Sequence, residues 1–291
     1  MPVRVVESKQ NARVKELRRA FTTPGRGERA LAGIEGIKML EEALRAGLHV
    51  ATVFVAQGAE RLLEPLTLPP GSEILRLPPA LLDSVLATEA PQPVAALVEP
   101  PEWSWAHVLG KHGSAALIVV VAGIQDPGNL GTILRSAEAF GATGIVRLPG
   151  TVSAWNPKSV RASAGSVFRM PLVAASEREC FERLREAGVR ILATSVRDAQ
   201  PADRVDMAES TALIVGNEGH GLADDLLTKA DAKITIPCPG PVESLNVAMA
   251  ATVLLYEAAR QRSTAIRRPS GQPRRSSRSL PREVKHRGAW R

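Results

Sequence analysis

The chain of 291 residues has 44% hydrophobic and 23% charged residues, a balance typical of a globular protein with one large or two modest domains. No apolar run approaches the roughly 18 residues that a membrane span needs, and the N-terminus lacks the apolar core of a signal peptide. Two cysteines, Cys180 and Cys238, exclude a disulfide scaffold and a zinc site built from several cysteines. We therefore expect a cytoplasmic protein without a membrane segment.

The positive charge lies at the two ends of the chain. The formal net charge is +7, yet residues 1–29 contain eight Lys and Arg against three Glu, and residues 261–291 contain ten against one Glu. The stretch between them must therefore carry about −7. Basic ends commonly contact a polyanion, and nucleic acid is the commonest one. The alternative for the C-terminal end is a solvated tail that only aids solubility.

The first 100 residues predict a basic arm followed by a small α/β domain. Residues 1–29 form the arm, with a helix over about 11–20 and a turn at Pro24-Gly25. Residues 30–100 form the domain, because helical and strand periodicities alternate there. Its expected elements are a helix over 34–47, a strand over 50–56, a short helix over 80–87 and a strand over 94–98. Residues 101–114, rich in Pro, Trp and Gly, are interpreted as a linker.

From Ala115 the pattern changes to strands that alternate with helices, which predicts a mostly parallel sheet covered by helices. This domain is expected to span residues 115–262. Strands are predicted over 117–122, 144–148, 172–174, 190–195, 211–216 and 233–236. Helices are predicted over 130–140, 158–162, 177–187, 223–229 and 245–261. Periodicity stops after Arg262, so residues 263–291 are predicted to be a disordered basic tail.

The common nucleotide and hydrolase motifs, such as G-x-G-x-x-G and G-x-S-x-G, are absent, and the five histidines have no metal-ligand spacing. Instead, three unusual loops follow predicted strands, where open α/β sheets build their sites. The first, over 122–135, contains Asn129 as an expected helix cap and Arg135 within the helix. The second, over 214–222, has three glycines in six positions around Glu218. The third, over 236–251, is rich in proline and contains Ser244, another expected cap, and Asn246.

Together and in this order, the three loops resemble the motifs of the SpoU (TrmH) family of RNA ribose methyltransferases, of the SPOUT class. The resemblance covers about 115–262. Residues 30–100, which open with Gly33-Ile-Glu-Gly-Ile-Lys38, are similar to the substrate-binding domain that precedes the catalytic domain in many rRNA-directed members. The resemblance implies an α/β fold with a SPOUT-type parallel sheet, whose C-terminal part forms a trefoil knot that binds S-adenosylmethionine.

The resemblance also implies roles for particular residues. The segment 156–165 looks like the element that lines the RNA pocket, where two cations would contact phosphates and a serine a sugar or base edge. The site would be completed across a homodimer, with Arg135 facing the cofactor of the other subunit, and no metal would take part. The implied active-site residues are Asn129, Arg135, Glu218, Ser244 and Asn246; the cofactor-binding residues are Thr194, Gly216, Ile236 and Leu245; the RNA-binding residues are Lys158, Arg161 and Ser163.

The implied reaction transfers a methyl group from a sulfonium to a ribose 2′-hydroxyl. It requires alignment of the two groups and stabilisation of the developing negative charge. Arg135 suits the second task, but a guanidinium stays protonated, so a role as base or as electrostatic stabiliser stays open. We expect 23S rRNA as the substrate, with guanosine as the nucleotide. The alternatives are a tRNA methyltransferase, an antibiotic-resistance rRNA methyltransferase, or a non-catalytic RNA-binding ribosome-assembly factor on the same scaffold.

Overall fold

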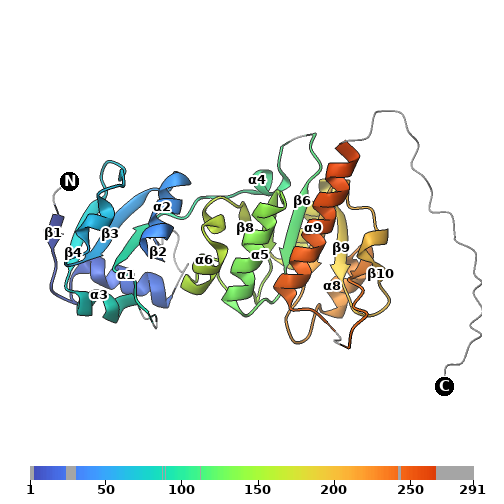
Figure 1. Ribbon diagram of the computed structural model, residues 1–291. Helices are drawn as coiled ribbons and strands as arrows, with labels where there is room; N and C mark the ends of the chain where they lie inside the picture. Colours follow the sequence, from blue (N-terminus) through green and yellow to red (C-terminus); the bar gives the residue numbers. More distant parts are fainter. Residues whose placement is uncertain are drawn as a thin grey trace, which may run out of the picture.

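The computed structural model describes residues 3–23, 31–86, 88, 90–111, 113–241 and 244–266. Two sheets organise these residues into two domains that lie end to end (Figure 1). We call residues 3–98 the first domain and residues 105–266 the second domain.

The first domain is built on a sheet with the strand order β1-β4-β3-β5-β2, in which β5 runs antiparallel to both of its neighbours. Its strands are β1 (Val3–Val5), β2 (Ala32–Glu35), β3 (Val50–Ala56), β4 (Glu73–Leu77) and β5 (Val94–Val98). Its helices are α1 (Ala12–Thr22), α2 (Ile37–Arg45), the 3-10 turn η1 (Glu60–Leu63) and α3 (Pro79–Leu86).

The N-terminal segment is part of this domain rather than a separate arm. Strand β1 pairs with β4, and the apolar residues Val14 and Leu17 of α1 are fully buried. They lie at helical spacing on one side of α1, so this side joins the core while the basic side chains remain outside. Residues 24–30, with the predicted Pro24-Gly25 turn, lie outside the described residues.

The second domain is built on a parallel sheet with the strand order β10-β12-β9-β11-β6-β7-β8 among the described residues. Its strands are β6 (Leu117–Val121), β7 (Gly144–Arg147), β8 (Leu172–Ala174), β9 (Arg190–Thr194), β10 (Gln200–Pro201), β11 (Thr211–Val215) and β12 (Ala232–Thr235). Its helices are α4 (Trp105–Leu109), α5 (Pro127–Ala139), α6 (Pro157–Ser163), α7 (Glu177–Glu186), α8 (Asp224–Lys229) and α9 (Val247–Ile266), with the 3-10 turns η2 (Ser166–Phe168) and η3 (Ala202–Arg204).

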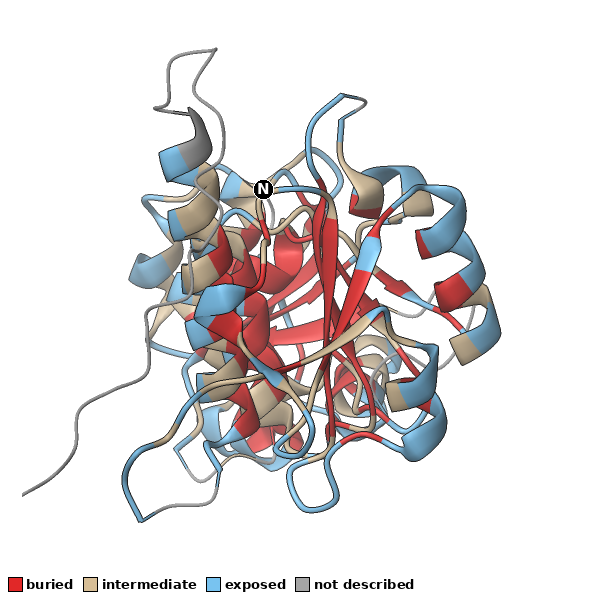
Figure 2. Cartoon of the chain, turned by 90° about the vertical axis from the view of Figure 1, so that its right-hand side faces the viewer, coloured by how far each residue is buried: buried red, intermediate tan, exposed pale blue. Residues whose placement is uncertain are grey.

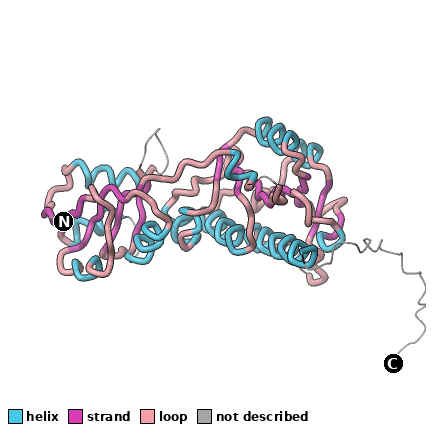
Figure 3. Tube along the Cα trace, turned by 90° about the horizontal axis from the view of Figure 1, so that it is seen from above, coloured by secondary structure: helices cyan, strands magenta, loops and turns pink. Residues whose placement is uncertain are grey.

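Helices cover both faces of this sheet, as the alternation of strands and helices predicts. One face packs against α5, α6 and α9 and the other against α4, α7 and α8, and Figure 3 shows helices on both sides of the strands. Figure 2 shows the strands buried between them. The central strands β6 and β11 are buried along their whole length, which explains their continuous apolar sequences.

Two boundaries differ from the sequence prediction. The expected linker over 101–114 contains α4, and Val108 of this helix is fully buried. A Cβ at Gly144 of β7 would lie 2.7 Å from the Val108 Cα, so α4 belongs to the second domain. The expected tail from residue 263 begins with helix, because α9 continues to Ile266; residues 267–291 lie outside the described residues.

The end of α9 is tied to the sheet by Arg262. Its guanidinium donates hydrogen bonds of 2.8–3.0 Å to four carbonyl oxygens, those of Ala115, Ala116, Met207 and Glu209. Burial lowers the pKa of this guanidinium below its ordinary value. None of the described helices has the length and apolarity needed to cross a membrane.

Candidate active site

The site predicted from the three loops lies where β6 and β11 end, because these strands are neighbours in the parallel sheet. The loop after β6 leads into α5, and the loop after β11 contains Glu218. The helix α9 packs beside α5, which brings its N-terminus to the same place. Three segments far apart in the sequence therefore meet at one edge of the sheet.

Asn129 links these three segments through both ends of its amide. Its Nδ2 donates to Glu218 Oε1 at 2.9 Å, and its Oδ1 accepts from Asn246 Nδ2 at 3.1 Å. Because each end of the amide has its own partner, the orientation of the Asn129 side chain is fixed.

The expected capping roles of Asn129 and Ser244 are wrong. Asp126 caps α5 by accepting from the amide of Gly128 at 2.6 Å. At α9, the Asn246 side chain accepts from the amide of Ala248 at 2.9 Å. Asn129 is thereby available for the network, and Ser244 is exposed beside it.

Glu218 is held by the start of the first segment. Its carboxylate accepts from Asn129 Nδ2 and, at 3.4 and 3.3 Å, from the backbone amides of Gln125 and Asp126. Two effects on the pKa of this carboxyl oppose each other: partial burial acts to raise it, and the hydrogen bonds act to lower it. The hydrogen bonds outweigh burial, so the pKa lies below its ordinary value. An ionised acceptor that is occupied in this way positions the loops and is a poor proton acceptor.

Arg135 lies on α5 beyond this network. Its side chain is exposed, and it forms no hydrogen bond or ion pair with another residue in the described part of the chain. A guanidinium two helical turns after Asn129 and without an intramolecular partner is available to a ligand or to another subunit.

The predicted RNA-binding residues are divided between three environments. Lys158 belongs to the first turn of α6, and its Nζ reaches the start of α5, 2.9 Å from Asp126 Oδ1. This contact, together with the cap, lowers the pKa of the Asp126 carboxyl. Arg161 instead pairs with Glu35 of the first domain at 3.2 Å.

The structure contradicts the prediction for Ser163. Its side chain is fully buried, and its hydroxyl donates to the carbonyl of Val160 at 2.8 Å. The reason is the close packing of α6 on α5, in which a Cβ at Gly131 would lie 2.4 Å from the Ser159 carbonyl oxygen. Ser163 is therefore part of the helix contact rather than of an RNA-facing surface.

The predicted cofactor positions lie together at the edge of the sheet. Thr194 ends β9, and Gly216 and Ile236 directly follow its neighbours β11 and β12. Leu245 immediately precedes Asn246. A Cβ at Gly216 would lie 2.5 Å from the backbone of Gly221. The two ends of this loop therefore approach each other too closely for a side chain at position 216. Backbone groups and uncharged side chains suit the nucleoside part of S-adenosylmethionine.

Sequence reasoning missed Asn217, which joins the first two loops. Its Nδ2 donates to the carbonyl of Gly123 at 2.8 Å, and its Oδ1 accepts from the amide of Gly219 at 2.9 Å. An asparagine inside a glycine-rich loop is the available signal, because its amide can replace backbone partners in a turn. No group of three or more His, Cys, Asp or Glu suited to a metal occurs among the residues with described positions.

Comparisons with known proteins identify the family. Residues 116–256 match the SpoU rRNA Methylase family, and residues 11–96 match the MRM3-like substrate binding domain. The 23S rRNA (guanosine(2553)-2′-O)-methyltransferase RlmP of Bacillus subtilis is 35% identical over 251 residues, which are 86% of this chain and 97% of the relative. The 23S rRNA (uridine(2479)-2′-O)-methyltransferase of Streptomyces viridochromogenes is 32% identical over 252 residues, or 81% and 86% of the two chains.

Solved structures agree as well. An AdoMet-bound rRNA methyltransferase from Sinorhizobium meliloti, 31% identical, superposes with a TM-score of 0.77 over 89% of this chain and 98% of its own. The methyltransferase AviRb from Streptomyces viridochromogenes, 29% identical, superposes with a TM-score of 0.75 over 88% and 99%. The chain therefore belongs to the SpoU family and is an S-adenosylmethionine-dependent RNA ribose methyltransferase.

Proposed function

We propose that this enzyme methylates the 2′-hydroxyl of one ribose in 23S rRNA, with guanosine as the nucleotide, and that it acts in the cytoplasm. Two relatives that align with most of the chain are named for 2′-O-methylation of 23S rRNA, one at a guanosine and one at a uridine. The match of residues 11–96 to a substrate-binding domain also supports a large structured RNA. The observation that carries the proposal is the Asn129–Glu218–Asn246 network, which joins all three loops on the helix that carries Arg135, a residue without a partner in the described part of the chain.

Arg135 is proposed to stabilise the charge that develops on the ribose oxygen. S-adenosylmethionine supplies an activated methyl group on its positively charged sulfur. A guanidinium is a poor base, so Arg135 is proposed to act as an electrostatic stabiliser, while the proton leaves to water or to an RNA phosphate. Glu218 and Asn246 hold Asn129 in place, and the exposed Ser244 hydroxyl is proposed to contact the nucleotide.

Thr194, Gly216, Ile236 and Leu245 are proposed to hold the cofactor, in a knotted C-terminal segment. The strand order supports a knot, because β11 lies between β9 and β6, and the chain then returns to place β12 between β9 and β10. In the proposed knot, the segment after β12 passes the connection between β9 and β10. Knots are rare in proteins, and this one would place the third loop against the second.

The enzyme is proposed to act as a homodimer through α9. Most of the apolar residues of α9, including Val247 and Leu254, are buried within the chain. The exposed apolar residues are Met249, Val253 and Tyr256, with 62, 42 and 55% exposure. They lie on one side of α9, next to the helix that carries Arg135. A second copy covering this apolar strip would bring Arg135 towards the partner's cofactor site.

RNA is proposed to lie across the start of α5 and α6, with Lys158 at a phosphate. Lys158 is exposed, and its ion-pair partner among the described residues is the partly exposed Asp126, so a phosphate can share this cation. The half-exposed guanidinium of Arg161 offers a second contact beside its ion pair with Glu35.

The deciding experiment is a map of 2′-O-methylated nucleotides in total RNA from cells with and without the gene, followed by methylation of the identified RNA by purified enzyme. We expect one 23S rRNA position to lose its methyl group. Loss at a tRNA position instead would refute the rRNA assignment. An unchanged map with no transfer in vitro would favour a non-catalytic RNA-binding protein.

A further inference from the structure

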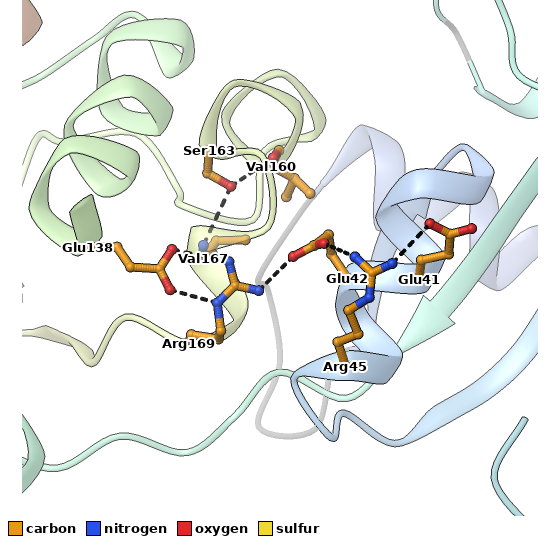
Figure 4. Close-up of polar contacts among 8 residues, drawn as sticks. All are labelled: Glu41, Glu42, Arg45, Glu138, Val160, Ser163, Val167 and Arg169. Atoms are coloured by element: carbon orange, nitrogen blue, oxygen red, sulfur yellow. Dashed lines mark hydrogen bonds and ion pairs between the residues drawn. The ribbon is translucent and has the colours of Figure 1, made fainter. Parts of the chain in front are cut away.

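The first domain contacts the second through two clusters of ion pairs. One joins Glu35 to Arg161 of α6, and the other joins Glu42 through Arg169 to Glu138 of α5, the helix that carries Arg135. Figure 4 shows Arg169 between Glu42 of the first domain and Glu138 of α5. We call these two clusters the interdomain clamp.

The Glu35 half of the clamp uses a buried carboxylate. The Glu35 side chain is 2% exposed, and its Oε1 accepts from Thr88 Oγ1 and from the amide of Gln92, both at 2.9 Å. Its Oε2 accepts from Arg161 at 3.2 Å. A buried carboxylate that loses its cation strongly destabilises the folded protein. Separation of the two domains at this point is therefore unfavourable.

The Glu42 half of the clamp reaches α5 directly. Arg169 holds Glu138 with both ends of its guanidinium, at 2.6 and 3.1 Å, and donates to Glu42 at 2.8 Å. The hydrogen bonds to Glu138 and, less strongly, to Glu42 raise the pKa of Arg169. In turn, the hydrogen bonds from Arg169 lower the pKa of both carboxyls. Glu138 lies one turn after Arg135 on α5, so the first domain is tied to the helix that carries the proposed catalytic residue.

The backbone between the two halves permits this close approach. Gly165 has φ +88°, and a Cβ there would lie 2.8 Å from the Glu42 Cβ. A side chain at this position would push α2 away from the second domain. Charge pairs, a required glycine and the packing of α6 on β2 all fix the same orientation.

We propose that Glu35 and Glu42 are positioning residues, which set the direction from which the first domain presents RNA to Arg135 and thereby select the methylated ribose. This inference rests on the proposed function. An ion pair network serves this purpose better than apolar contact alone, because hydrogen-bonded charges require one geometry. Loosening the clamp should affect RNA recognition and leave the chemistry at the strand ends unchanged.

The test compares Glu42→Gln with Glu41→Gln, its neighbour on α2. Glu41 pairs with Arg45 of its own helix at 3.6 Å, whereas Glu42 also reaches Arg169, so the two variants remove the same charge with and without the interdomain contact. We expect Glu42→Gln to raise KM for rRNA about two- to fivefold, with kcat and S-adenosylmethionine affinity unchanged, and Glu41→Gln to resemble the wild type. Mapping should also show new minor methylation sites for Glu42→Gln.

Small-angle X-ray scattering on the same proteins provides a readout independent of RNA. We expect a wider distribution of interdomain distances for Glu42→Gln, and a larger effect for Glu35→Gln, whose amide would direct N–H groups at Arg161. Unchanged scattering together with an unchanged KM and methylation map would overturn the proposal. If the wild-type enzyme methylated no rRNA, the proposed function would fail while the scattering still tested the clamp.

Discussion

Replacement of Arg135 by alanine should separate catalysis from folding. The side chain is exposed and unpaired within the described structure, so its loss should change the free energy of unfolding by less than about 0.5 kcal/mol. Removing one preorganised donor to a developing oxyanion typically costs about 100- to 1000-fold in rate, or about 2.7–4 kcal/mol. We expect a loss of this size in kcat, with an unchanged Tm.

The assay is transfer of labelled methyl groups to 23S rRNA, combined with calorimetric titration of S-adenosylmethionine. Cofactor affinity should stay unchanged, because Arg135 lies on α5, whereas the proposed cofactor residues lie at the ends of β9, β11 and β12 and before α9. Arg178→Ala is a suitable control, since Arg178 is an exposed helix residue that pairs with Glu182 of its own helix. Near-normal turnover by Arg135→Ala would refute the assignment.

Mixing two inactive variants tests whether Arg135 acts in the partner's site. Gly216→Ala should prevent cofactor binding, because the added Cβ meets the Gly221 backbone. In a mixed dimer, the Arg135→Ala subunit has an intact cofactor site and receives Arg135 from its partner. Random mixing should therefore restore about one quarter of wild-type activity, whereas action within one subunit restores none.

Four further predictions follow from the packing, the loops and the charges. Gly131→Ala should destabilise the protein by about 1–3 kcal/mol through overpacking, despite the better helix propensity of alanine, and an unchanged Tm would contradict the α5–α6 contact. Calorimetry with EDTA should leave S-adenosylmethionine binding intact; abolished binding would point to a metal. Tyr256→Glu should shift light scattering from a dimer to the 31.0 kDa monomer, and a monomeric wild type would refute the dimer. Hydrogen bonds outweigh burial and keep the pKa of Glu218 low in the folded protein. The stability that they provide should be present above the pKa of Glu218 in the unfolded chain, and should be lost as pH falls through its pKa in the folded protein. Glu218→Gln should then weaken this acid-side pH dependence in thermal melts, and an identical dependence would contradict it.

The sequence by itself determined most of the second domain. Buried parallel strands are continuous apolar runs, so strands such as 117–122 and 211–216 were predicted within a residue of β6 and β11. The family motifs likewise predict that the three loops after the strands form the site. Strand β2 was missed because Ile34 and Glu35 precede a helix with the same apolar spacing, and Gly36, with φ +92°, separates the two elements.

Only the tertiary structure decided which polar groups meet. Capping patterns in the sequence favoured Asn129, but Asp126 lies at the helix boundary and takes that role, which leaves Asn129 to join Glu218 and Asn246. Ser163 and Arg161 occupy one short helix, yet the first faces α5 and the second reaches Glu35, 126 positions earlier. Local periodicity describes the faces of a helix, whereas the neighbour of each face depends on long-range packing. That packing places Ser163 in the core and Arg161 in the interdomain clamp.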